Sequence, residues 1–564
     1  MTRLDKAIGS PAAAGLIFLV SLAILLLGMD LRLGIYDEGI ILTGASRVME
    51  GAVPHRDFYA NYGPAQFYTV AGLFHLFGPS FLIARFYDLL VRAAIVAILF
   101  RLVAGRSRPL TALAIATICG LWMLGTRLYL YPVFPALLLA LIGTQLLLPV
   151  SEGRLSAARL AGAGAMTGLC ALFRYEVGFF LLAAHGVALV WLALRRSDPA
   201  RRNLAEALRQ ALLYGAGTAA IFLPPALLLL SAGAGPGFVH DILEFPQQYY
   251  VRMRSLPFPG PAAIRAFPTD AAVYLPFAAL ALAAIALAGD IARRKAGAHH
   301  AFLLLFGLLT LALAVKGLVR ISAAHMLIAI IPSLVLMAIL ADRPESRFPA
   351  RAAAWFLAFL AFFTGGYQVA GMAKGFAADP GRSFAGSALG LEARTPATVS
   401  AGAALPNIAR ARLLPEEACA AQMVAAFTGP EDRIFVGTMR HDKLFVNKIE
   451  LYFATGRGPG THWYHFDPGL QTSAEVQGEM IADLQANRVN WVVRDSTWDD
   501  VAEPNESARS SGVTLLDLYL ADRYRPVGAF GPISVWRANA LPEPAGLRTW
   551  RCPLPGASPS PAPR

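Results

Sequence analysis

Long apolar runs separated by short basic loops are the feature that most constrains this chain. A run of about 17 to 25 mostly apolar residues crosses the hydrocarbon core of a bilayer as a helix, because lipid offers no partner to the backbone amides. About eleven such runs occur, at residues 11–31, 80–104, 109–126, 130–149, 158–173, 177–194, 207–231, 271–289, 300–318, 322–340 and 352–371. The sequence therefore predicts a polytopic α-helical membrane protein.

The composition excludes one competing class. The 564 residues are 56% hydrophobic and 15% charged, whereas soluble domains are about 25% charged. A net charge of +12 in a soluble protein would suggest a nucleic-acid partner. Here the arginines lie in short clusters between apolar runs, and the cytoplasmic loops of membrane proteins carry such clusters. We therefore expect no nucleic-acid partner.

The basic clusters also predict the orientation. Every second loop is basic, with Arg101, Arg106 and Arg108, then Arg154 and Arg159, then Arg195, Arg196, Arg201 and Arg202, then Arg293, Arg294 and Lys295, then Arg343, Arg347 and Arg351. The positive-inside rule places these loops and the N-terminus in the cytoplasm. An odd number of crossings then places everything after about residue 372 outside. We predict a multi-pass protein of the bacterial inner membrane with a periplasmic or extracellular C-terminal domain.

Two of the predicted outside loops are long. The first, residues 32–79, has helical spacing of apolar residues at 40–49 and again at 67–77, which predicts two amphipathic helices lying along the membrane interface. The second, residues 232–270, is rich in proline and aromatic residues and is expected at the membrane surface. The membrane domain so described covers residues 1–371.

The pattern changes in the last third of the chain. Residues 372–412 are rich in Gly, Ala and Pro and resemble a linker. Short β-type runs at 433–437 and 489–493 alternate with helical spacing at 447–455 and 474–485, which predicts a small α/β domain over residues 413–550, closed by strands at 524–530 and 532–538. The tail, 551–564, is predicted to be disordered.

Two of the four cysteines, Cys419 and Cys552, fall in this C-terminal region. An extracytoplasmic location permits a disulfide between them. Two unpaired thiols are an equal alternative, because a sequence contains no distance between them.

An acidic pair, Asp37 and Glu38, directly follows the first apolar run. Carboxylates beside a membrane are costly unless they are solvated, paired or used. The ordinary interpretation is helix capping, with Asp37 at the N-cap and Glu38 in the first turn. The functional interpretation depends on the residues that follow the pair.

Those residues form an extended motif. The acidic pair and a predicted helix are followed by Gly51-x-x-Pro54-x-Arg56-Asp57-Phe58, by Tyr62-Gly63-Pro64 and by Arg85 at the start of the next run. Over about the first ninety residues this arrangement resembles the polyprenyl-phosphate-sugar-dependent glycosyltransferases of the GT-C superfamily. The resemblance is to the bacterial branch related to protein O-mannosyltransferases and the lipid A aminoarabinose transferase. It agrees with the predicted plan of membrane spans and an outside C-terminal domain.

The resemblance implies a reaction at the outer face of the membrane. A sugar passes from a polyprenyl-phosphate carrier to an acceptor with inversion, without a nucleotide sugar. The family's acidic residue maps onto Asp37, which would act as the catalytic base or orient the acceptor hydroxyl. By the same mapping, Glu38 would help to hold the acceptor or a divalent cation.

The leaving phosphate also requires positive charge. The candidates on the predicted outer face are Arg56, Arg174, Lys316, Arg320 and His325. For Arg174 an internal ion pair with Glu176 is an equal alternative. Lys316 and Arg320 are spaced as one helical turn.

Further candidates come from the two outside loops. Residues predicted to contact the acceptor or to shape the loops are Asp57, Tyr62, Glu176, Tyr249 and Tyr250. Tyr249 and Tyr250, with Arg252 and Arg254, would form a lid over the donor site or an aromatic belt. His240, Asp241 and Glu244 have donor types suited to a divalent metal ion, although a solvated helix start is the favoured interpretation.

The C-terminal segment THWYHFDPG, residues 461–469, combines aromatic rings with His462, His465 and Asp467. Aromatic rings stack on sugars, which suggests acceptor binding. The favoured alternative is an exposed loop packed on the membrane domain.

Two other functions compete with the glycosyltransferase. A transporter or flippase for lipid-linked saccharides predicts polar residues within the spans and a repeat relating two halves, and neither is evident. A non-enzymatic partner in envelope-glycan assembly would depend on the α/β domain alone. The sequence names neither the sugar nor the acceptor, which is a protein, a lipid or a polysaccharide.

Overall fold

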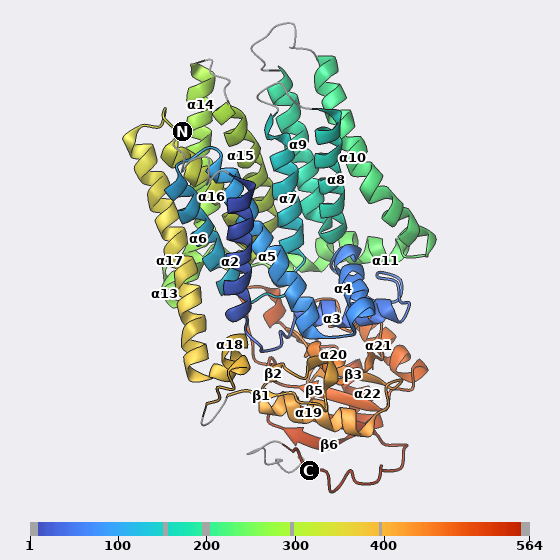
Figure 1. Cartoon of the computed structure of the whole chain (residues 1–564). Helices are drawn as coiled ribbons and strands as arrows, with labels where there is room; N and C mark the ends of the chain where they lie inside the picture. Colours follow the sequence, from blue (N-terminus) through green and yellow to red (C-terminus); the bar gives the residue numbers. More distant parts are fainter. Residues whose placement is uncertain (1–9, 150–155, 195–203, 294–297, 394–396, 554–564) are drawn as a thin grey trace.

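A bundle of long helices with an α/β domain packed against one end forms the molecule (Figure 1). The computed structural model describes residues 10–149, 156–194, 204–293, 298–393 and 397–553. Several of the basic residues that predicted the orientation lie outside these ranges, namely Arg154, Arg195, Arg196, Arg201, Arg202, Arg294 and Lys295.

A helix forms at each of the predicted apolar runs. These helices are α2 (Pro11–Leu27), α5 (Phe81–Ala104), α6 (Pro109–Gly125), α7 (Val133–Leu147), α8 (Ala157–Phe173), α9 (Tyr175–Leu194), α10 (Leu204–Ser231), α14 (Leu275–Ala292), α15 (Ala298–Gly317), α16 (Ala323–Asp342) and α17 (Phe348–Ala378). Within the described ranges, six segments are long and apolar enough to cross a membrane, namely α9, α10, α14 with the turn before it, α15, α16 and α17. The helices α2, α6, α7 and α8 are apolar but shorter. The number of eleven crossings stays a prediction.

Helix α5 is long, but it carries charged side chains on its buried face. Arg85 pairs with Glu38 at 2.6 Å, and Arg92 pairs with Asp88 at 2.6 Å. Arg92 also donates to three backbone carbonyl groups at and beyond the end of α6. A buried charge is tolerated when it is paired and hydrogen-bonded in this way. The buried ion pairs of α5 thus connect the first outside loop to the bundle.

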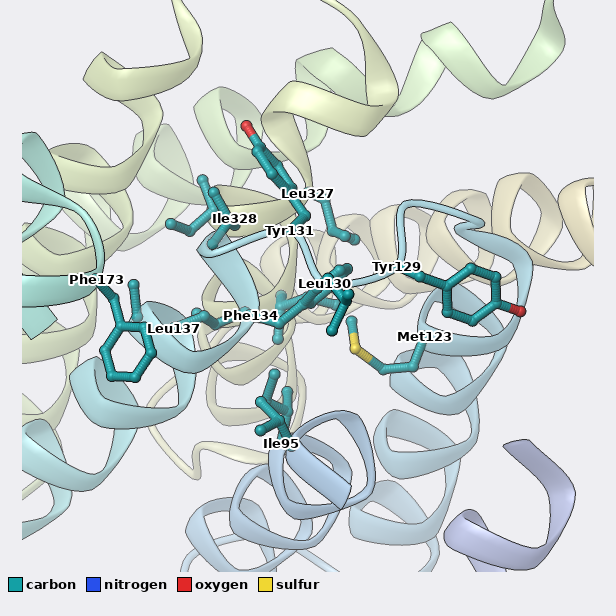
Figure 2. Packing of buried hydrophobic residues seen from close by; sticks show 14 of the residues in the cluster. Ile95, Met123, Tyr129, Leu130, Tyr131, Phe134, Leu137, Phe173, Leu327 and Ile328 are labelled. Carbon is teal, nitrogen blue, oxygen red and sulfur yellow. The ribbon is translucent and has the colours of Figure 1, made fainter. Parts of the chain in front are cut away.

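The turn between α6 and α7 has an unusual backbone. Leu130 adopts φ 58° and is buried in the apolar cluster shown in Figure 2. Its neighbours Tyr129 and Tyr131 point away from each other (Figure 2). The Tyr129 hydroxyl accepts from the backbone N–H of Asp30 at 2.9 Å, and the Tyr131 hydroxyl accepts from Lys316 Nζ at 2.9 Å. The left-handed residue, rare outside glycine, therefore directs the two tyrosines on either side of it to different parts of the bundle end.

The first outside loop contains the two expected helices, α3 (Asp37–Met49) and α4 (Pro64–Phe77). α4 exposes large apolar side chains, among them Leu76 and Phe77, as an interfacial helix would. α3 differs from the expectation, because residues 38–45 are all buried. Its Ile40 carbonyl accepts from the Tyr464 hydroxyl of the α/β domain at 3.0 Å. α3 therefore lies between the bundle and the α/β domain, and most of its residues are buried there.

The second outside loop is mostly helical. It contains α11 (Gly235–Val239), two π-helical turns η3 (His240–Glu244) and η4 (Pro246–Tyr250), α12 (Val251–Arg254), α13 (Pro261–Ala266) and the 3₁₀ turn η5 (Pro268–Tyr274). Arg254 binds Asp467 of the α/β domain at 3.0 Å. Leu256 forms a β-bridge with Arg320, which lies between α15 and α16. The second outside loop is therefore attached both to the α/β domain and to the turn between α15 and α16.

The segment predicted as a linker is built into the structure. α17 continues to Ala378 and is followed by η6 (Pro380–Arg382), α18 (Phe384–Ala388), β1 (Val399–Ser400), η7 (Pro406–Ile408) and β2 (Arg412–Leu413), with β1 antiparallel to β2. Arg382 pairs with Asp30 at 2.6 Å, and Arg412 pairs with Glu392 at 2.8 Å. These ion pairs attach the segment to the start of the first outside loop and to itself.

The α/β domain has a five-stranded mixed sheet in the order β4-β3-β5-β7-β6. β3 is parallel to β4 and β5, and β7 is antiparallel to β5 and β6. Its elements are α19 (Pro415–Phe427), β3 (Arg433–Thr438), α20 (Glu450–Thr455), β4 (Gly458–Pro459), α21 (Ala474–Ala486), β5 (Trp491–Asp495), η8 (Glu506–Ala508), α22 (Leu515–Arg523), β6 (Tyr524–Phe530) and β7 (Ile533–Ala538). The predicted strands and helices are all present. Residues 554–564 of the predicted tail lie outside the described residues.

A disulfide joins Cys419 to Cys552, with the two Cα atoms 5.3 Å apart. It attaches the segment after the sheet to α19, and it decides between the two alternatives left open by the sequence. Cys119 and Cys170 are buried free thiols.

Candidate functional site

A cavity of about 430 Å³ lies where the helical bundle, both outside loops and the α/β domain meet. Most of the candidate residues line it, namely Asp37, Tyr62, Arg174, Glu176, Asp241, Tyr250, Lys316, Arg320 and His325. They come from the ends of five helices and from both outside loops, separated by up to 288 positions between Asp37 and His325. The other candidates, Glu38, Arg56, Asp57, Tyr249, His240 and Glu244, do not line this cavity.

Asp37 is the first residue of α3 and its side chain is half-buried. Tyr36 occupies the N-cap position, so Asp37 does not cap the helix. Asp37 Oδ1 accepts a short hydrogen bond from the Tyr62 hydroxyl. Burial raises the pKa of Asp37, although Tyr62, Arg174 and Lys316 act in the opposite direction. A carboxylate with a raised pKa beside a cavity is suited to accept a proton from a bound hydroxyl group.

Two cations lie on the bundle side of the cavity. Arg174, directly after α8, donates through Nε to Glu176 Oε1 at 2.8 Å, and its guanidinium lies 4.9 Å from the centre of the Tyr62 ring. Lys316, at the end of α15, donates to the Tyr131 hydroxyl at 2.9 Å. Arg174 thus forms the expected internal ion pair and also faces the cavity. Both cations are placed to hold an anion beside Asp37.

Arg320 completes the cationic wall, and His325 lies beside it in the same cavity. α15 ends at Gly317, so Lys316 and Arg320 do not share a helical face, and the spacing argument for them was wrong. Arg320 lies in the turn before α16 and donates to Glu503 of the α/β domain at 2.7 Å. His325 Nδ1 lies 2.8 Å from Ser322 Oγ. The turn geometry, which spacing does not reveal, brings both side chains to the cavity.

Glu38 and Arg56 are placed elsewhere. Glu38 pairs with Arg85 of α5 and accepts from the backbone N–H of Gly34 at 2.7 Å. Arg56 is 42% exposed and pairs with Asp57 at 2.6 Å on the outer surface of the first loop. The structure therefore does not bring Glu38, Arg56 or Asp57 together with Asp37 in one cavity.

The candidate metal ligands are not gathered around one point. Asp241 is hydrogen-bonded to His55 Nδ1 at 2.9 Å, to His240 Nδ1 at 3.0 Å and to the backbone N–H of Ala60 at 3.1 Å. Burial opposes ionisation of Asp241, but its bonds to His240 and His55 outweigh that effect and lower its pKa. Glu244 is exposed. In the described ranges, no group of three His, Cys, Asp or Glu side chains is arranged to hold a metal ion.

A layer of aromatic residues in the cavity wall was not predicted from the sequence. Tyr36, Tyr59, Tyr131, Tyr175 and Phe445 all line it. Tyr249 instead stacks on Phe245, with the ring centres 6.2 Å apart. The sequence contained one signal for this aromatic layer, because three tyrosines, Tyr36, Tyr59 and Tyr62, lie in and around the Asp37 motif.

No family model matches the sequence, and no curated protein matches it either. The fold, however, is similar to that of ArnT from Cupriavidus metallidurans bound to undecaprenyl phosphate, with a TM-score of 0.51 and 15% identity over 95% of this chain and 100% of ArnT. ArnT in the apo state gives a TM-score of 0.51 and 16% identity over 93% of this chain and 98% of ArnT. The oligosaccharyltransferase of Archaeoglobus fulgidus gives 0.46 and 12%, over 86% and 69%.

The chain therefore has an ArnT-like fold, and its long apolar helices are those of an integral membrane protein. The similarity of fold extends along the whole length of ArnT, a lipid A aminoarabinose transferase. The resemblance found in the first ninety residues is thereby confirmed at the level of the fold.

Proposed function

We propose that this protein is an integral-membrane glycosyltransferase that moves a sugar from a polyprenyl-phosphate carrier to an acceptor, with inversion. The observation that carries the proposal is the shared cavity, in which the Asp37 carboxylate lies with the cations Arg174 and Lys316. The similarity to ArnT, whose structure contains undecaprenyl phosphate, supports a lipid phosphate as the carrier. We place the reaction at the outer face of the bacterial inner membrane, on the side of the α/β domain.

The cavity suits the two halves of this reaction. Asp37 accepts the proton of the acceptor hydroxyl while the hydroxyl oxygen forms a bond to the anomeric carbon of the sugar. The bond from that carbon to the carrier phosphate breaks, and its electron pair remains on the phosphate. Attack from the face opposite the phosphate inverts the anomeric centre.

The cationic wall serves the leaving group. Negative charge grows on the carrier phosphate as its bond to the sugar breaks, and fixed cations beside it lower the barrier. Arg174, Lys316, Arg320 and His325 are our proposed contacts for this phosphate. Tyr62, Glu176 and Tyr250 line the same cavity and are proposed contacts for the acceptor. The cationic side chains come from helix ends and turns that pack against the bundle. This packing keeps the cations in place before a ligand binds.

The carrier-linked sugar can be identified in a strain that lacks the protein. Mass spectrometry of its polyprenyl-phosphate sugars and envelope glycans should show an accumulated donor and a missing product. The purified protein in lipid vesicles should then transfer the sugar from that donor to the acceptor identified by the missing product. If no carrier-linked sugar accumulates, or if flux occurs without cleavage of the glycosidic bond, the transferase assignment is wrong and a transporter is favoured.

We expect Asp37→Asn to reduce transfer between about a hundredfold and ten-thousandfold, the usual contribution of a general base. The matched control is Asp522→Asn, because Asp522 is an exposed carboxylate on α22, and it should transfer at the wild-type rate. Full activity of Asp37→Asn, measured at saturating donor, would remove Asp37 as the base.

A further inference from the structure

Asp467 lies where the α/β domain meets both outside loops. The residue is 0% exposed. Its Oδ1 accepts from the Tyr36 hydroxyl at 2.8 Å and from Arg254 Nη2 at 3.0 Å, and its Oδ2 accepts from the Tyr59 hydroxyl at 3.1 Å. These three donors come from three separate stretches of chain, and all three line the cavity. One carboxylate of the C-terminal domain therefore fixes three parts of the cavity wall.

In the cluster of Asp467, Tyr36, Tyr59 and Arg254, the buried negative charge is paired with a cation and both carboxylate oxygens are hydrogen-bonded. A buried carboxylate is costly unless it is paired and fully hydrogen-bonded, and Asp467 meets a guanidinium and two phenols. Burial opposes its ionisation, but Arg254, His465 and the Tyr36 hydroxyl together outweigh that effect and lower the pKa of Asp467. Burial raises the pKa of Tyr36 and Tyr59 well above that of free tyrosine, so both remain hydroxyl donors. The Asp467 backbone N–H donates to Gln471 Oε1 at 2.7 Å, which fixes the turn itself.

The cluster reaches both functional walls of the cavity. Tyr36 directly precedes Asp37 and occupies the N-cap position of α3, so its ring anchors the backbone from which Asp37 projects. Arg254 accepts, through its backbone carbonyl, a hydrogen bond from Arg320 Nη1 at 3.1 Å. Among the described residues, the Tyr62 hydroxyl is the one hydrogen-bond donor to the Asp37 side chain. The orientation of Asp37 thus depends on how firmly its backbone is held.

We propose that Asp467 is a positioning residue for the transfer reaction, because it holds Tyr36, Tyr59 and Arg254 so that Asp37 and the cationic wall face the same cavity. The inference rests on the proposed function and extends it to the α/β domain. That domain is then part of the catalytic unit, since its buried carboxylate holds three residues that line the cavity. The α/β domain is not a separate acceptor-binding module in this view.

Asp467→Asn in the full-length protein tests the inference, with Asp517→Asn as the matched control. Asp517 also accepts from an arginine and a histidine in the α/β domain, Arg494 at 2.6 Å and His441 at 2.8 Å, and it does not line the cavity. We expect Asp467→Asn to lower kcat at least about tenfold with a smaller change in KM, since misplacement by about 1 Å costs up to about a hundredfold. Asp517→Asn should keep the wild-type kcat.

The pH profile separates positioning from a general loss of structure. The titratable or charged groups that act on Asp37 are Tyr62, Arg174, Lys316 and Asp467. The negative charge of Asp467 helps to raise the pKa of Asp37. In Asp467→Asn the acid limb of kcat/KM should therefore move to lower pH, whereas in Asp517→Asn it should stay in place. Asp467→Glu, which keeps the charge, should return the limb toward its wild-type position.

The outcomes distinguish this inference from the proposed function. If Asp37→Asn is inactive while Asp467→Asn matches the wild type in kcat and in its pH limb, the positioning role is wrong and the proposed function stands. If the wild type itself transfers nothing, both fail. Where Asp467→Asn gives no folded protein, Tyr36→Phe and Tyr59→Phe each remove a hydroxyl that donates to Asp467 and keep the ring. Wild-type kcat in both of these variants would also overturn the inference.

Discussion

Asp37 and Glu38 are neighbours in the sequence, but their side chains leave α3 in directions about 100° apart. One side chain lies beside the cavity and is hydrogen-bonded to Tyr62, and the other is buried against Arg85 of α5. The two carboxylates therefore have different tasks. Asp37 is available for chemistry, while Glu38 and Arg85 fix the end of α3 that presents it.

At this scale the pH dependence of transfer is a direct test. Burial raises the pKa of Asp37, and a base acts only when deprotonated. The value of kcat/KM should therefore fall as the pH falls, with an apparent pKa above the ordinary range of an aspartate. Tyr62→Phe removes a hydrogen bond that lowers the pKa of Asp37, so the acid limb should move to higher pH.

The control for this measurement is Tyr68→Phe, since Tyr68 is an exposed tyrosine on α4. Its profile should overlay that of the wild type. An acid limb that Tyr62→Phe leaves unmoved, or moves to lower pH, would show that Asp37 is not the group that titrates.

At the scale of elements, α3 is the part that joins the two halves of the protein. It can lie between them because two of its glycines, which have no side chain, leave room for closely packed neighbours. A Cβ at Gly39 would lie 2.9 Å from the backbone nitrogen of Glu450, and a Cβ at Gly44 would lie 2.5 Å from the Phe67 ring. The small residues thus permit contact on both faces of the helix, which holds Asp37 between the bundle and the α/β domain.

Gly39→Ala should therefore destabilise the protein, because backbone of the α/β domain occupies the space that the methyl group needs. We expect a loss of about 1–3 kcal/mol, as for other overpacked sites, measured by thermal unfolding of the purified protein, together with lower transfer. Gly72→Ala on α4 is the matched control, because a Cβ there meets nothing within 4 Å. Equal melting temperatures for the two variants would show that α3 is not tightly held.

At the scale of the whole molecule, two of the basic junctions lie at the opposite end from the α/β domain. The junctions between α5 and α6 and between α16 and α17 are at the end of the bundle far from the α/β domain (Figure 1). These junctions contain Arg108 and Arg347. By the positive-inside rule we propose that the cavity lies on the outer side, because an oxidising compartment also suits the disulfide between Cys419 and Cys552.

Single added cysteines test this orientation with a membrane-impermeant maleimide. Asp522→Cys, on α22, should be labelled in intact spheroplasts, whereas Arg108→Cys, at an exposed position before α6, should be labelled only after lysis. The native cysteines give little background, because two are buried and two are joined. The reverse labelling pattern would place the cavity in the cytoplasm and exclude a reaction at the outer face.

The sequence by itself determined the helices of the bundle and the main strands of the α/β domain. The length of each apolar run predicted a helix, and local alternation predicted the main strands of the sheet, because both depend on periodicity within one segment. The motif around Asp37 predicted the GT-C fold. The tertiary structure alone decided which side chains share the cavity. Asp467 and Tyr36 are 431 positions apart, and Glu503 approaches Arg320 across 183. Local patterns contain no information on such contacts, because they arise only when the α/β domain packs against both loops.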